Sequence, residues 1–231
     1  CEKSGNRNAR KEKERTIMYP RLVIDLEKVK NNVRVMRELT DRGNCELGLV
    51  TKSFCADPEI VKAIDSVGID FFADARVQNL ESYKEIKTPK MLLRLPQHCE
   101  IEKVVSFADM SLNSELSTIK LLDQEAAKQG KTHKVVLMID LGDLREGIFF
   151  KDEDIIMSTV EEILKLKNIK LHGVGVNLTC YGAVIPKQDN LSTLVEIAGK
   201  IESRFNIKLD MISGGNSSSI YLIDKEGLPE G

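Results

Sequence analysis

The residue best suited to covalent chemistry is a lysine at the end of an apolar segment. Lys52 follows the run ELGLVT at 46–51, which has the character of a short buried strand. An amine in that position can be partly desolvated and can then act as a nucleophile or a base. The alternative is an ordinary lysine solvated in a loop, and Lys52 alone does not decide between the two.

A segment rich in serine and glycine follows another apolar run. Residues 213–219 read SGGNSSS and come directly after LDMI at 209–212. The glycines allow close backbone approach to a ligand, and free amides and hydroxyl groups complete the composition of a phosphate-binding loop. The alternative is a flexible turn with a serine as helix cap. A strand-end lysine and a phosphate loop together suit a pyridoxal phosphate enzyme, because one forms the Schiff base and the other anchors the cofactor.

Two further polar segments follow apolar runs, DLGDLR at 140–145 and NLTCYG at 177–182. Arg145 could neutralise a substrate carboxylate or a phenolate oxygen of a cofactor. It could instead form a surface ion pair with Glu146 or Asp143.

No metal site is expected. Asp140 and Asp143 have no histidine near them and are separated by a glycine, which does not suit a metal. One histidine falls in a loop, one before an expected strand and one within a strand. None lies at the strand ends where the polar segments above begin, so none receives a catalytic role. The histidines are His98, His133 and His172.

The elements that would position these residues alternate regularly along the chain. Strands are predicted at 46–51, 70–74, 90–95, 109–113, 134–141, 170–178 and 209–213, and helices at 57–67, 76–86, 100–107, 115–129, 152–166 and 190–205. This alternation indicates parallel βαβ units. Its repetition favours an α/β fold of the TIM type, a (β/α)₈ barrel, over an open doubly wound sheet. In such a barrel the carboxyl ends of the strands form the functional face.

Seven strands are one fewer than a closed barrel has. LVIDL at 22–26 is also expected to form a strand, followed by an amphipathic helix. It could supply the eighth strand, or that strand could lie beyond Gly231. The pattern alone leaves both possibilities open.

Composition excludes several classes of protein. Hydrophobic residues make up 42% and charged residues 30%, which is typical of a globular protein. The net charge is −2, so no overall electrostatic field would attract nucleic acid or an anionic membrane. No apolar stretch approaches the roughly 20 residues of a transmembrane helix. The five cysteines are odd in number and include no CxxC pair, so we interpret them as reduced thiols of a cytoplasmic protein.

The first 17 residues differ from the rest. Residues 1–17 carry six basic and three acidic groups and few apolar ones, so they are expected to be a disordered leader. The chain opens on Cys1, and Met18 directly precedes the first apolar run. Met18 is therefore the expected natural start, and 18–231 is the expected barrel domain.

In combination, several segments resemble the alanine racemase amino-terminal-domain family of fold-type III pyridoxal phosphate enzymes, most closely its ornithine racemase-like members. The resemblance runs from Met18 to Gly231 and is carried by MYPRLVIDL, VTKSFCADPEI, LLRLP, SLNSE, DLGDLREGI, GVNLTCYG and ISGGNSSS. It implies pyridoxal 5'-phosphate as cofactor, an amino acid as substrate and inversion of its α-carbon. Lys52 matches the Schiff-base lysine and, once released, can serve as acid or base on one face.

Positions carried over from the family give the expected cofactor site. Arg145 matches the arginine near the phenolic oxygen and the substrate carboxylate, and Asn216 with Ser217 matches the phosphate-binding pair. The residues expected to contact the cofactor are Lys52, Arg145, Asn177, Ser213, Gly214, Gly215, Asn216 and Ser217.

Three positions depart from alanine racemases. Asn177 stands where a histidine packs against the cofactor ring, Met138 where a carbamylated lysine supports the arginine, and Ala56 where a tyrosine binds phosphate. These departures count against a strict alanine racemase and are compatible with the ornithine-type branch.

The family also implies parts that should follow Gly231. These are an Arg-Ile-Gly motif on the next strand and a carboxyl-terminal β-domain, which supplies a tyrosine base to the partner in a homodimer. Residues 22–26 would belong to the sheet of that domain. Without these parts, the barrel would be truncated before its last strand, and the chain is expected to bind the cofactor weakly and to racemise poorly.

Other functions stay open. One is a pyridoxal phosphate homeostasis protein without turnover, and another is a lyase or decarboxylase on the same fold. A third is an isomerase barrel that uses the serine-rich loop for a sugar phosphate. The sequence does not indicate which amino acid is the substrate.

Overall fold

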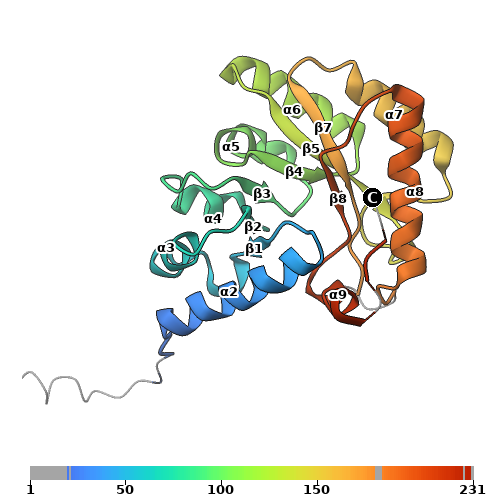
Figure 1. Cartoon of the computed structure of the whole chain (residues 1–231). Coiled ribbons are helices and arrows are strands. Elements are labelled where there is room, and N and C mark those ends of the chain that lie inside the picture. Colours follow the sequence, from blue (N-terminus) through green and yellow to red (C-terminus); the bar gives the residue numbers. More distant parts are fainter. Residues whose placement is uncertain (1–19, 21, 180–183, 226, 230–231) are drawn as a thin grey trace, which may run out of the picture.

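The computed structural model describes residues 20, 22–179, 184–225 and 227–229, where strands and helices alternate as predicted (Figure 1). The expected leader at 1–17, Met18 and residues 180–182 lie outside the described residues. The strands are β1 (Gly48–Val50), β2 (Phe71–Asp74), β3 (Lys90–Leu92), β4 (Met110–Asn113), β5 (His133–Asp140), β6 (Ile148–Phe149), β7 (Ile169–Gly175) and β8 (Met211–Ser213). The helices are α2 (Leu26–Arg42), α3 (Pro58–Asp65), α4 (Val77–Ser82), α5 (Ile101–Phe107), α6 (Leu116–Gln129), α7 (Glu153–Leu164), α8 (Gln188–Phe205) and α9 (Tyr221–Lys225), with 3₁₀ turns η1 (Lys52–Phe54), η2 (His98–Glu100) and η3 (Ser217–Ser219).

The main sheet has seven parallel strands in the order β1-β2-β3-β4-β5-β7-β8. Helices α3 to α8 lie around its outer face (Figure 1). This confirms a parallel α/β half-barrel of seven strands, consistent with a truncated (β/α)₈ barrel. The short β6, which the sequence pattern did not predict, pairs with β5. None of the helices in the described ranges is long and apolar enough to cross a membrane.

Side chains alternate between the two faces of the sheet and form two apolar clusters. The larger cluster lies between the sheet and the helices, as the amphipathic stretches require. The inner cluster consists of Ala73, Met91, Met110, Leu112, Val136 and Met138. Val50 of β1 and Met211 of β8 both pack against it, although no pairing between these two strands is seen in the described part of the chain. The inner cluster therefore joins the first and last strands of the sheet.

The outer layer also connects the two ends of the sheet. The end of α2, which precedes β1, packs against α9, which follows β8 (Figure 1). Arg42 Nη2 lies 3.0 Å from Asp224 Oδ1, and a Cβ added at Gly43 would contact Ile223 at 3.1 Å. The curved sheet is thus held at its open side by helix packing as well as by the inner cluster.

The prediction of a strand at 22–26 is wrong. Residues 22–25 have no regular structure, Leu22 is 86% exposed and α2 begins at Leu26. Asp25 caps this helix, because its Oδ1 accepts hydrogen bonds from the amides of Glu27 and Lys28 at 3.0 and 3.2 Å. A strand needs a neighbouring strand for its hydrogen bonds, and 22–25 has none among the described residues. Whether this segment joins the sheet of a second domain remains a prediction.

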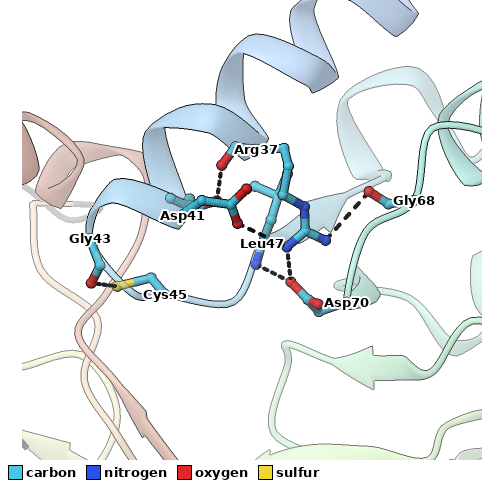
Figure 2. A network of polar contacts seen from close by, with 8 residues as sticks. Arg37, Asp41, Gly43, Cys45, Leu47, Gly68 and Asp70 are labelled. Carbon is cyan, nitrogen blue, oxygen red and sulfur yellow. Dashed lines mark hydrogen bonds and ion pairs between the residues drawn. The ribbon is translucent and has the colours of Figure 1, made fainter.

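The junction of α2, β1 and β2 depends on one carboxylate. Asp70 Oδ2 lies 2.7 Å from Arg37 Nη1 and accepts a hydrogen bond from the Leu47 amide at 2.6 Å (Figure 2). Burial of the Asp70 carboxyl disfavours its charged form, but the bonds from Arg37 and Leu47 outweigh that effect and lower its pKa. The ionised side chain therefore fixes the helix to the starts of both strands.

We expect Asp70→Asn to lower the free energy of unfolding by about 1–2 kcal/mol at pH 7, since it removes a charge-assisted pair. Because the folded-state pKa of Asp70 is lowered, this contribution is present above the unfolded pKa of about 4 and is lost as the pH falls below it. Urea unfolding at pH 7 and pH 3 measures both effects. Asp41→Asn is the control, because Asp41 lies 3.7 Å from the same Arg37 and is more exposed. Equal losses in the two variants would contradict the assignment.

Candidate functional site

The expected site residues come after the carboxyl ends of four parallel strands. Lys52 follows β1, Arg145 follows β5, Asn177 follows β7, and residues 213–217 end and follow β8. Because the strands are parallel, these ends lie on one edge of the sheet. Strands β1 and β8 stand at opposite ends of the strand order, yet Val50 and Met211 reach the same inner cluster. Lys52 and Ser213 each lie two residues beyond these contacts.

Lys52 is exposed, and the residue before it, Thr51, is held in place by hydrogen bonds to β2. The buried Thr51 donates from its hydroxyl group to Asp74 Oδ2 at 2.6 Å, and its amide donates to the Ala73 carbonyl at 2.8 Å. Lys52 then opens the 3₁₀ turn η1, which ends at Cys55 in the left-handed conformation. The Lys52 side chain is thus exposed to solvent on a turn whose preceding residue, Thr51, is held by hydrogen bonds.

Asp74 organises the polar layer beneath this turn. Besides Thr51, it accepts hydrogen bonds from the Arg76 amide at 2.8 Å and from Asn79 Nδ2 at 3.1 Å. The hydroxyl group of Tyr83 lies 3.3 Å from Thr51 Oγ1, and burial raises the pKa of Tyr83 to about 12. Tyr83 is therefore neutral across the physiological range, and the network carries one buried carboxylate with several donors.

A carboxylate also stands between the loops after β5 and β7. Arg145 Nε lies 2.9 Å from Glu146 Oε2, so the ion pair that was one alternative for Arg145 is present. Asn177 donates from Nδ2 to Glu146 Oε1. The loop itself is held by Asp140, whose Oδ1 accepts the amides of Gly142 and Leu144 at 2.8 and 3.1 Å. Arg145 and Asn177 are thus brought together, and Glu146 connects them.

The side-chain amide of Asn216 connects the loop after β8 to the segment that follows β7. Asn216 Nδ2 donates to the Leu178 carbonyl at 3.0 Å, and its Oδ1 accepts from the amide and the hydroxyl group of Ser218. Gly215 has φ +112°, and a Cβ there would lie 3.0 Å from Ser219 Oγ. The backbone therefore turns in a way that other residues would resist.

This loop has the donors that a phosphate group requires. Within the described residues, the amides of Gly215, Asn216 and Ser217 have no hydrogen-bond acceptor, and the Ser217 side chain is exposed. A phosphate monoester accepts several backbone N–H bonds at such a concave turn. The residues present therefore fit the phosphate of pyridoxal phosphate, whereas no group of potential metal ligands occurs in the part of the chain that the structure describes.

The histidines are placed much as expected, with one correction. His133 starts β5, bonds Ser111 Oγ at 2.8 Å and has its pKa lowered to about 4 by burial. His172 lies in β7 beside Asp210. His98, however, follows β3 and so lies on the carboxyl-end side of the sheet. It packs outward, because its Nε2 lies 3.2 Å from Thr118 Oγ1 at the start of α6.

The sequence analysis did not predict the role of Asp74 in the site. It also did not predict that Glu146 connects Arg145 to Asn177. Asp74 ends a predicted strand, as Thr51 does, and a polar residue at that position was the available signal. Glu146 was considered only as an ion-pair partner, because its bond to Asn177 crosses 31 positions of sequence. Of the cysteines, Cys45, Cys55 and Cys99 are free thiols.

Comparison with protein families matches residues 24–228 to the alanine racemase N-terminal domain. The chain is 55% identical over 214 residues to ornithine racemase of Acetoanaerobium sticklandii and 32% identical over 217 residues to lysine racemase of Thermotoga maritima. Each alignment covers 93% of this chain but only 60% of the relative. Among solved structures, D-threo-3-hydroxyaspartate dehydratase from Delftia sp. HT23 has a TM-score of 0.75 at 15% identity, covering 93% of this chain and 60% of that one. That likeness shows the fold.

We expect Asp74→Ala to lower the free energy of unfolding by about 2–4 kcal/mol, because Thr51, Asn79 and the Arg76 amide would lose a buried acceptor. Asp123→Ala is a matched control at the opposite edge of the sheet. Asp123 also accepts a backbone and a side-chain bond, both from Asn168 at 2.8 and 3.2 Å, but it is only half-buried. Urea unfolding of both variants tests the ranking, which an equal or larger loss in the control would refute.

Proposed function

The chain belongs to the alanine racemase N-terminal-domain family, and from this membership we propose that it is the pyridoxal phosphate-binding barrel of an amino acid racemase, with ornithine as the first candidate substrate. The observation that carries the proposal is its 55% identity to a protein named ornithine racemase. The chain spans about 60% of the length of that relative, so the activity of the whole protein is part of the proposal.

Lys52 is proposed as the catalytic residue. Pyridoxal phosphate, when bound to an amino acid, withdraws electrons from the α-carbon and makes its proton acidic. Lys52 Nζ is proposed to hold the cofactor covalently before the substrate arrives, and then to give or take the proton on one face of the α-carbon. Inversion requires a second acid or base on the opposite face, and the described residues supply no assigned candidate. We propose that a partner subunit supplies it in a homodimer.

The remaining residues are proposed to bind and orient. The amides of residues 215–217 and the Ser217 hydroxyl would hold the phosphate, and Ser213 and Gly214 would set the start of that loop. Arg145 would neutralise a carboxylate or a phenolic oxygen. Asn177 would lie beside the ring. A cytoplasmic location is also proposed, because the five cysteines in the sequence are odd in number and include no CxxC pair.

Reduction with borohydride after incubation with pyridoxal phosphate tests the covalent site. We expect the label on the peptide that contains Lys52, located by mass spectrometry, and its loss in Lys52→Ala. Lys62→Ala, an exposed lysine on α3, is the control and should keep the label. Label on another lysine, or none at all, would remove Lys52 from the proposal. In the whole protein, a chiral assay with L-ornithine, L-lysine and L-alanine then separates a racemase from a protein that only carries the cofactor.

Gly215→Ala tests the phosphate loop. We expect it to weaken pyridoxal phosphate binding about tenfold or more, because the new Cβ would contact Ser219 Oγ in a left-handed backbone. Gly130→Ala is a control for backbone strain alone, since Gly130 has φ +63° with no atom within 4 Å of an added Cβ. Absorbance titration gives the two dissociation constants. A similar loss in both variants would show that the loop is not the phosphate site.

A further inference from the structure

Glu146 bonds two polar side chains of the candidate site at once. Its Oε2 lies 2.9 Å from Arg145 Nε, and its Oε1 accepts a hydrogen bond from Asn177 Nδ2. The Glu146 side chain is 13% exposed, against 39% for Arg145. One largely buried carboxylate therefore joins residues that follow two different strands, β5 and β7.

The backbone on both sides of this bridge is already fixed. Asp140 holds the loop after β5 through the amides of Gly142 and Leu144. The Val176 amide, next to Asn177, donates to the Ser213 carbonyl at 3.0 Å. The freedom that remains lies in the side-chain torsions, which are costly to order in a residue as long as arginine. The contact with Glu146 restricts the side-chain torsions of Arg145.

We propose that Glu146 is a positioning residue, which orients the Arg145 guanidinium to receive the carboxylate of an amino acid ligand. The ion pair at Nε holds the guanidinium beside the Glu146 carboxylate and limits the directions in which its N–H donors can point. Planar recognition of a carboxylate depends on that orientation. The inference rests on the proposed function, because it assumes that an amino acid binds beside Lys52.

A direct role for Glu146 in binding the distal ammonium of ornithine fits the contacts less well. One of its oxygens already accepts a hydrogen bond from Asn177, and the other is paired with the charge of Arg145 at 2.9 Å. A second cation at the same carboxylate would be repelled by that guanidinium. The pair is thus better suited to a ligand's anionic end than to its cationic one.

Glu146→Gln in the pyridoxal phosphate-loaded chain tests the inference. Glutamine removes the charge that pairs with Arg145, whereas a hydrogen bond to Asn177 can be kept, because the Asn177 amide can rotate to present either its oxygen or its N–H₂ group. We expect the affinity for L-ornithine to fall about tenfold, while that for 1,4-diaminobutane, which lacks the carboxylate, changes less than about twofold. Spectral titration of the lysine-bound cofactor gives both constants. A merely structural role would affect the two ligands alike.

Glu125→Gln is a closely matched control. Glu125 is 14% exposed and also bonds a cation and an amide, Lys128 at 2.8 Å and Gln129 at 3.1 Å, but on the last turn of α6 at the other edge of the sheet. It should leave both affinities unchanged. Equal losses for the two ligands, no loss for L-ornithine, or the same loss in the control would overturn the role of Glu146.

Two further measurements separate the possible failures. If Glu146→Gln fails to fold in urea titrations, Glu146→Asp replaces it. Aspartate keeps the charge but is too short to reach both partners, so the same selective loss of L-ornithine binding is expected and its absence refutes the inference. If the unsubstituted chain takes up no pyridoxal phosphate on Lys52, the proposed function itself fails, and the inference fails with it.

Discussion

The candidate site depends on the packing of the first and last strands of the sheet against one apolar cluster. Val50 of β1 and Met211 of β8 stand at opposite ends of the strand order, yet both contact the inner cluster of the curved sheet. All the strands run in one direction, so the residues that follow these contacts emerge on the same edge. Lys52 and the loop that begins at Ser213 therefore share an edge, and each begins two residues after a contact with the inner cluster.

Buried carboxylates hold the loops on that edge in place. Asp74 lies under the turn of Lys52, Asp140 under the loop of Arg145, and Glu146 between that loop and the end of β7. Asp74 and Asp140 each accept at least two hydrogen bonds, and Glu146 accepts one and forms an ion pair, as charges withdrawn from solvent require. The groups left exposed at the edge are then a few side chains on fixed backbone, among them Lys52 and Ser217. Such pre-organisation is what binding a small charged ligand needs.

The sequence predicts the strands of the sheet well, because strands buried on both faces read as continuous apolar runs whose polar successors mark the functional edge. It does not predict pairs such as Thr51 with Asp74 or Asn177 with Glu146, which depend on strand register and loop geometry. The failure at 22–26 has a different cause. An apolar run becomes a strand only where another strand supplies hydrogen bonds, and hydrophobicity alone does not show whether that strand exists.

The composition of the inner cluster explains how an open sheet can still be packed inside. Met91, Met110, Met138 and Met211 all lie on this face, where a closed barrel usually has branched aliphatic residues. Methionine is unbranched and flexible, so it fills irregular gaps that valine or isoleucine cannot reach. Side chains of this kind can span the distance between strands that do not pair.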